Sequence, residues 1–160
     1  MTTALFIGRF LPLHSAHLED IKAIIKECDR VIIAIGSAQK SRTEKNPFTI
    51  DERKEMVRLV LENNNISRFE IVAVPDIEND ALWVDHVKKL CKHFDVAYTG
   101  NDYVASLFEG KNIPVERISL IPGYSGTAIR EKLKQGEPWE HLVPKPVAKI
   151  VESSGFQSQL

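Results

Sequence analysis

The sequence predicts an α/β fold, organised as a doubly wound parallel sheet with helices covering both faces. Two observations lead to this prediction. Short apolar runs recur along the chain, and most lack the alternation of a strand that faces water on one side. Amphipathic stretches long enough for helices separate one run from the next. Strands buried on both faces and joined by helices are typical of parallel sheets, so we expect a single domain over residues 1–160.

The strands are expected where the apolar runs lie, with a glycine or a proline closing them. The second run is β-branched and almost wholly apolar, and Gly36 follows it, whereas Pro75 follows the third run. The expected strands are Ala4–Ile7, Val31–Ile35, Glu70–Val74, Val96–Thr99 and, as a possible fifth, Arg117–Ile121.

The helices are placed by hydrophobic periodicity and by capping residues. Thr49, answered three residues later by Glu52, forms a capping box that opens one helix. Ser125 caps another, which Gly136 and Pro138 stop. The expected helices are Ser15–Glu27, residues 49–62, Ala81–Lys92, Asp102–Phe108, residues 125–135 and Pro144–Glu152, with a frayed tail over Gly155–Leu160.

The composition describes an ordinary globular protein and excludes some partners. With 21 basic and 22 acidic residues, the chain lacks the basic excess of a whole-surface nucleic-acid or membrane binder. No apolar run approaches the roughly 20 residues that span a bilayer. Because only Thr2 and Thr3 lie between Met1 and the first expected strand, we expect no signal peptide. Cys28 and Cys91 are far apart in sequence, which favours buried thiols in a reducing, cytoplasmic compartment.

The first candidate motif, Gly8-Arg9-Phe10-Leu11-Pro12-Leu13-His14-Ser15-Ala16-His17, joins the first strand to the first helix. His14 and His17 share a helix face, where they can donate to phosphate oxygens together with the free N–H groups of the helix start. Two other interpretations stay open. The pair are ordinary loop histidines, one of them stacked on Phe10, or they are two ligands of a zinc site whose remaining ligands are not nearby.

The second motif, Gly123-Tyr124-Ser125-Gly126-Thr127-Ala128-Ile129-Arg130, also follows an expected strand. Ser125 and Thr127 supply hydroxyls, Gly126 allows close backbone approach, and Arg130 can fold back over the helix N-terminus. The alternative is a plain serine cap beside a solvated arginine. Two anion-binding helix starts on one sheet edge suit a nucleoside triphosphate. The long polar and basic loop Ser37–Phe48 lies past the second strand, and a loop of this length favours a function.

Together the two motifs resemble the nucleotidylyltransferase superfamily, and the chain is most similar to the archaeal-type nicotinamide-nucleotide adenylyltransferases. The resemblance implies a Rossmann-like domain that catalyses adenylyl transfer from ATP to nicotinamide mononucleotide, giving NAD and pyrophosphate. Further stretches keep the order of the family over nearly the whole chain: Gly36-Ser37-Ala38-Gln39, Asn46-Pro47-Phe48-Thr49, Glu52-Arg53, Pro75-Asp76-Ile77, Ala81-Leu82-Trp83-Val84 and Gly100-Asn101.

The resemblance also assigns roles. The attacking phosphate is already anionic, so the reaction needs no general base, and catalysis reduces to positioning and charge stabilisation. His17 is expected nearest the α-phosphate, with His14 and Arg9 on the phosphates and Arg130, Ser125, Gly126 and Thr127 at the β/γ end. Mg²⁺ is expected with ATP. Gly8, Phe10, Gly100 and Asn101 are expected in the ATP site, although Gly100-Asn101 is equally a simple turn.

For the mononucleotide, the resemblance implies Trp83 stacked on the nicotinamide ring and Lys45 near the phosphate. Trp83 facing the core and Lys45 solvated are the alternatives. Asp76 is expected to orient either the loop or the base. Because relatives of this kind are commonly hexameric, the resemblance implies a homo-oligomer.

The chain departs from the family pattern at several positions. Ala16 replaces the glycine between the two histidines, where its methyl group lies at the phosphate-binding helix start. Asp80 stands where an asparagine often bonds the nicotinamide carboxamide; a carboxylate accepts from the amide but repels nicotinic acid mononucleotide. These changes bear on the rate and on the choice of acceptor. The remaining departures are Leu11, Leu13 and Arg42.

Other functions stay open beside this one. The first keeps the reaction and changes the acceptor, for instance to nicotinic acid mononucleotide. The second is a non-catalytic nucleotide sensor, which would bind ATP or NAD and release no pyrophosphate. A nucleic-acid module is weaker because the charge is balanced.

Overall fold

The computed structural model describes residues 1–156 of the chain, and its five strands form one parallel sheet. The strand order is β3-β2-β1-β4-β5, so the chain winds outward from β1 in one direction and then in the other. This is the doubly wound arrangement that the sequence predicts, with its switch point between β1 and β4. The strands are β1 (Thr3–Gly8), β2 (Arg30–Gly36), β3 (Phe69–Val74), β4 (Val96–Thr99) and β5 (Val115–Arg117).

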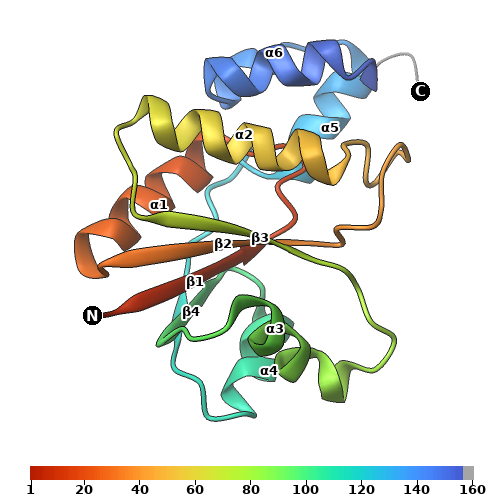
Figure 1. The fold of residues 1–160 in the computed structure, drawn as a ribbon. Coiled ribbons are helices and arrows are strands. Elements are labelled where there is room, and N and C mark those ends of the chain that lie inside the picture. The colour runs from red at the N-terminus through yellow and green to blue at the C-terminus, as the bar shows by residue number, and fades with distance from the viewer. Residues whose placement is uncertain (157–160) are drawn as a thin grey trace.

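Helices cover both faces of the sheet (Figure 1). One face carries α1 and α2, with α5 and α6 stacked beyond them, and the other carries α3 and α4. The helices are α1 (Ser15–Glu27), α2 (Ile50–Asn63), α3 (Trp83–Cys91), α4 (Asp102–Glu109), α5 (Gly126–Gln135) and α6 (Lys145–Ser153), with short 3₁₀ turns η1 (Asp80–Leu82) and η2 (Glu140–Leu142). Among residues 1–156, no helix has both the length and the apolar character needed to cross a membrane.

The core is divided by the sheet into two layers, because successive side chains of a strand point to opposite faces. Ala4 and Phe6 of β1 point into the layer under α1, α2, α5 and α6, whereas Leu5 points into the layer under α3 and α4. In β2 the three residues Val31, Ile32 and Ile33 are at most 3% exposed. Burial on both faces explains why these runs are continuously apolar.

Local signals in the sequence place the helix ends correctly. The Thr49 hydroxyl accepts from the Glu52 N–H at 3.1 Å, and the Glu52 carboxylate accepts from the Thr49 N–H at 2.9 Å, which is the predicted capping box. The Ser125 hydroxyl accepts from the Ala128 N–H at 3.0 Å. The α5 helix ends at Gly136, which adopts the left-handed conformation with φ +70°.

Two predicted elements need correction. The fifth strand is Val115–Arg117 rather than Arg117–Ile121, since only the earlier residues pair with β4, and Leu120 is 77% exposed beyond the sheet. The predicted frayed tail begins as packed structure, because the Phe156 ring is buried and lies 5.7 Å from the Phe48 ring, centroid to centroid. The rest of that predicted tail, residues 157–160, lies outside the described residues.

Candidate active site

A cavity of about 370 Å³, which we call the main cavity, opens at the carboxyl ends of β1 and β4, at the switch point of the sheet. Ligands of open α/β sheets bind at such points because the flanking helix starts face the crevice. The two sequence motifs meet in this cavity, although more than 100 residues separate them along the chain. The predicted residues that line it are Gly8, Arg9, His14, His17, Gly100, Asn101, Ser125 and Gly126.

His14 and His17 cap the α1 helix for each other. The His17 N–H donates to Nδ1 of His14 at 3.3 Å, and the His14 N–H donates to Nδ1 of His17 at 3.1 Å. The two rings stack with their centroids 3.5 Å apart, and the His17 ring also packs on Phe10, at 4.8 Å. The pair is therefore built into the helix start and is not a set of solvated loop side chains.

This capping arrangement fixes the tautomer of both rings. Since each Nδ1 accepts a hydrogen bond, the proton of each neutral ring lies on Nε2. Burial lowers the pKa of His14 to about 4. Burial and the neighbouring His14 together hold the pKa of His17 well below its usual value. At neutral pH both histidines of the free protein are thus uncharged donors with an available Nε2–H.

The start of α5 lies directly on the loop that follows β1. Nη1 of Arg130 donates to the Leu11 carbonyl at 2.6 Å, and Nη2 donates to the Thr127 hydroxyl at 3.3 Å. A Cβ on Gly126 would lie 2.9 Å from the Leu11 carbonyl oxygen and 2.8 Å from Nη1 of Arg130. Glycine is therefore required at this close approach, as the motif predicts.

Positive charge gathers at this edge of the sheet. The pKa of Arg130 falls to about 10, because burial and then the positive charge of Arg9 disfavour the guanidinium cation. Arg9 itself is exposed, and within residues 1–156 it forms no ion pair with a carboxylate. Like charges held together without a counter-ion make a site that an anion stabilises.

The remaining predicted residues lie around this centre or apart from it. Phe10 is buried, and its ring packs edge-on against Phe6. Asn101 uses its side chain to cap α4 through the Val104 N–H, so Gly100-Asn101 is both a turn and part of the cavity wall.

Two of the residues predicted for the mononucleotide lie close to each other in sequence and on the same side of the sheet. The half-buried Trp83 ring packs edge-on against Phe108, with centroids 5.5 Å apart. The carboxylate of Asp80 accepts a hydrogen bond from the Tyr103 hydroxyl. Trp83 thus has a core contact and is also partly exposed, and neither Trp83 nor Asp80 lines the cavity at the switch point.

Lys45 lies elsewhere. It lines a smaller cavity of about 220 Å³, which Thr127, Arg130 and Lys134 also line. A hydrogen bond of 2.6 Å between Lys134 and Glu44 fastens the basic loop to α5 beside this cavity. The structure therefore brings Lys45 next to the start of α5 and not next to Trp83 and Asp80.

Asp20 also lines the main cavity, although neither sequence motif includes it. Burial, and to a smaller extent the charge of Glu19, raises its pKa to about 6. Asp20 lies three residues after His17, on the same face of α1, and this spacing is the signal that could have found it.

The described residues contain no group of three or more His, Cys, Asp and Glu side chains placed to hold a metal ion. Cys28 and Cys91 are buried free thiols, as predicted. The zinc interpretation of the histidine pair therefore finds no further ligands within residues 1–156.

Comparisons with known proteins agree with the geometry. The family model of cytidylyltransferase-like proteins matches residues 5–132. The chain is 47% identical to a nicotinamide-nucleotide adenylyltransferase of Methanococcus maripaludis, over 93% of this chain and 88% of the relative. It is 41% identical to a nicotinamide-nucleotide adenylyltransferase of Pyrococcus furiosus, over 95% of this chain and 84% of the relative. The chain belongs to the nicotinamide-nucleotide adenylyltransferase family. The resemblance drawn from the two motifs is confirmed.

Solved structures confirm the predicted fold. A bifunctional NMN adenylyltransferase/ADP ribose pyrophosphatase from Francisella tularensis, crystallised with AMP and a manganese ion, superposes with a TM-score of 0.81 at 23% identity. The match covers 99% of this chain and 51% of that one, so this chain spans about half of its length. The NadR protein in complex with NAD and AMP-PNP superposes with a TM-score of 0.70 at 18% identity, over 88% of this chain and 44% of that one.

Proposed function

We propose that this chain transfers the adenylyl group of ATP to nicotinamide mononucleotide, forming NAD and releasing pyrophosphate. One observation carries the proposal: Arg9, His14, His17 and the start of α5 meet in one cavity at the switch point of the sheet. Membership of the adenylyltransferase family supplies the reaction. The geometry supplies a reason for it, since the neutral histidine donors and the guanidinium groups of Arg9 and Arg130 suit a polyphosphate.

The chemistry follows from the state of these groups. The phosphate of the mononucleotide is an anion before it attacks, so no base has to remove a proton. It attacks the α-phosphorus in line, and the bond to the β-phosphate oxygen breaks as pyrophosphate leaves. Nε2–H of His17 donates to the α-phosphate oxygens as their charge changes, with Nε2–H of His14 and the guanidinium of Arg9 beside it. Arg130, Ser125, Gly126 and Thr127 receive the leaving β and γ phosphates.

The adenosine end of ATP occupies the part of the cavity bounded by Gly8, Gly100 and Asn101. Phe10 supports this wall from within by packing on the His17 ring. The exposed Leu120 side chain lies over Gly100, since a Cβ added to Gly100 would come to 2.8 Å from Cδ2 of Leu120. Leu120 thus gives the adenosine end an apolar cover.

The nicotinamide ring stacks on the exposed part of Trp83, and the carboxylate of Asp80 accepts from the carboxamide NH₂. This contact favours the neutral carboxamide over the carboxylate of nicotinic acid mononucleotide. Lys45 contacts phosphate, and its place beside Thr127 and Arg130 favours the triphosphate end over the mononucleotide phosphate first expected for it.

A divalent cation, Mg²⁺ by preference, accompanies ATP. The donor set fits a metal that arrives on the nucleotide, because the described residues contain no group of three carboxylate, thiol or imidazole side chains that could hold an ion alone. The cation would be bound by phosphate oxygens and water, with Asp20 as the acidic residue that lines the main cavity among residues 1–156. When bound, it neutralises charge on the triphosphate. We further propose a cytoplasmic location and a homo-oligomer, with the hexamer that is common among such relatives as the expected form.

A pyrophosphate-release assay with ATP, Mg²⁺ and a panel of mononucleotides tests the proposal. We expect release with nicotinamide mononucleotide and formation of NAD in equal amount. Release only with nicotinic acid mononucleotide or another phosphorylated acceptor would replace the acceptor and keep the reaction. Tight binding of ATP or NAD without release from any acceptor would show a nucleotide sensor instead.

A further inference from the structure

A buried arginine without an acidic partner lies beneath the active-site edge of the sheet. Arg53, in the first turns of α2, is 0% exposed. Its guanidinium forms no ion pair with a carboxylate within residues 1–156 and donates to main-chain carbonyls instead. The acceptors are Gly36 at 2.8 Å, Ser37 at 3.1 Å, Arg9 and Lys40 at 3.2 Å, Thr49 at 3.4 Å and Ala38 at 3.5 Å.

Such an arrangement is unusual on energetic grounds. A buried charge carries a large cost in solvation free energy unless fixed dipoles replace the lost water. Here the carbonyl dipoles of three separate segments replace it. Burial and the nearby Arg9 lower the pKa of Arg53, whereas Asp76 opposes that change. A hydrophobic side chain would fill this position at less cost, so the charge needs another explanation.

The contacts of Arg53 explain what the charge does. They join the peptide of Arg9, at the end of β1, to the turn of residues 36–40, at the end of β2. Gly36 of the same turn leaves room beside the Arg9 side chain, since an added Cβ at Gly36 would come to 3.9 Å from Cγ of Arg9. Arg53 therefore holds the backbone from which the Arg9 guanidinium projects and the neighbouring turn beside which its stem lies.

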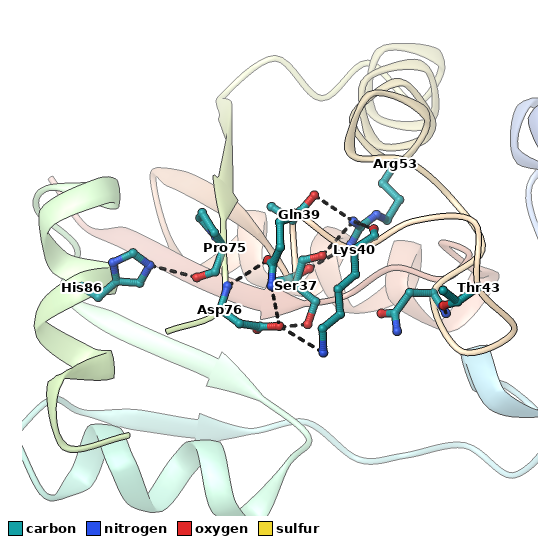
Figure 2. Close-up of polar contacts among 11 residues, drawn as sticks. Ser37, Gln39, Lys40, Thr43, Arg53, Pro75, Asp76 and His86 are labelled. Atoms are coloured by element: carbon teal, nitrogen blue, oxygen red, sulfur yellow. Dashed lines mark hydrogen bonds and ion pairs between the residues drawn. The ribbon is translucent and has the colours of Figure 1, made fainter. Parts of the chain in front are cut away.

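A second residue holds the same turn from outside (Figure 2). The carboxylate of Asp76 accepts from the Ser37 hydroxyl at 3.1 Å and from the Gln39 amide at 3.2 Å, and lies 3.4 Å from Nζ of Lys40. The Asp76 N–H donates back to the Gln39 side-chain oxygen at 3.0 Å. The turn is thus fastened to β3 by its side chains and to α2 by its carbonyl groups.

We propose that Arg53 and Asp76 are positioning residues for the adenylyl transfer. Arg53 from inside and Asp76 from outside lock the turn of residues 36–40 against Arg9, so that the Arg9 guanidinium is held at the reacting phosphates. The proposal rests on the proposed function. Neither side chain lines the main cavity, so both act through Arg9 and the turn.

The first experiment compares kinetic constants in folded variants. Arg53→Lys keeps the charge and loses the fork that reaches several carbonyls at once. We expect kcat to fall by roughly tenfold or more, since displacing a catalytic group by about 1 Å can lower the rate about a hundredfold. KM for ATP should change by less than about threefold. Arg58→Lys, on the exposed side of the same helix and paired with Glu55 and Glu62, is the control and keeps normal constants.

Asp76→Ala gives the same test at an exposed position, where no side chain is removed from the core. We expect the same pattern with a smaller loss of kcat, roughly threefold to tenfold, because Arg53 still holds the carbonyls. Asp85→Ala removes an exposed carboxylate that pairs with Lys111 and serves as its control. Unchanged kcat in Asp76→Ala and in folded Arg53→Lys would overturn the proposal, even if both proteins melt at a lower temperature.

A double-substitution cycle distinguishes positioning from a purely structural role. If Arg53 acts through Arg9, Arg53→Lys costs little further activity once Arg9→Ala is present. If the two losses in kcat multiply instead, the proposal is wrong. Wild-type activity is measured first with nicotinamide mononucleotide, so that an absent reaction counts against the proposed function and not against these residues.

Discussion

The triphosphate half and the acceptor half of the proposed cleft differ in how their side chains are held. In the triphosphate half, His14 is 5% exposed, and its ring and that of His17 accept from each other's main chain. In the acceptor half, Asp80 is exposed and held by one hydrogen bond from the exposed Tyr103. The first half is preorganised before any ligand arrives, whereas Asp80 in the second is held by a surface contact that contributes little.

This difference predicts unequal kinetic consequences for the two halves. Preorganised donors act on charge that changes in the transition state, so their loss lowers kcat. Side chains that only grip the acceptor contribute equally to ground and transition states, so their loss raises KM.

The largest effect is expected at His17. His17→Ala removes the Nε2–H donor and should lower kcat by about a hundredfold or more, with a smaller change in KM for ATP. His93→Ala is the matched control, since the His93 side chain is 78% exposed and pairs with Asp95. Steady-state kinetics on folded protein measure both constants. Near-normal turnover in His17→Ala would refute the assignment and remove the contrast between the halves.

A second prediction concerns Trp83. Trp83→Ala should raise KM for nicotinamide mononucleotide by about tenfold, because a lost aromatic stack is worth roughly 1 kcal/mol or more, while kcat changes less. Trp83→Phe keeps an aromatic face and the contact with Phe108, so it should stay closer to the wild type. An unchanged KM in Trp83→Ala would mean that Trp83 serves the core alone.

Features that depend on local sequence signals were predicted correctly. Capping residues act within a few positions of each other, so the helix starts at Thr49 and Ser125 were predicted correctly. The convergence of the two motifs was predicted as well, because parallel strands end at one edge of the sheet.

Long-range contacts were not predictable from pattern alone. The stretch Arg117–Ile121 was interpreted as a fifth strand, yet Leu120 and Ile121 are exposed and line the cavity, so their apolar character relates to the site and not to the sheet. The burial of Arg53 depends on carbonyls contributed by segments up to 44 residues away. No local pattern reveals such a partner set.

A smaller change is expected at Asp80. Asp80→Asn removes a negative charge at the proposed carboxamide site, so the efficiency with nicotinic acid mononucleotide relative to nicotinamide mononucleotide should rise by about threefold to fivefold, the scale of one exposed charge pair. Tyr103→Phe leaves that charge in place and should keep the ratio. An unchanged ratio in Asp80→Asn would show that Asp80 does not contribute to the choice of acceptor.

The smallest effect concerns pH and stability. The histidine pKa values are lower in the folded protein than the ordinary value of 6.5, so the unfolded chain binds more protons and stability falls as pH drops from about 6.5 towards 4. Asp20 acts in the opposite sense. Its folded pKa of about 6 exceeds the ordinary 3.8, so its contribution to stability is present at low pH and is lost as pH rises through 6.

Asp20→Asn should therefore stabilise the protein at pH 7.5, by about 1 kcal/mol after allowance for solvent screening, and this gain should vanish near pH 4. Without the opposing Asp20, the variant should lose stability more steeply than the wild type between pH 6.5 and 4, because the two histidines then act alone in this cavity. Denaturant unfolding at several pH values measures the difference, with Asp85→Asn as an exposed control on α3. A gain that is the same at every pH would show that the Asp20 carboxyl group titrates normally in the folded protein and that the cavity wall is wetter than its burial indicates.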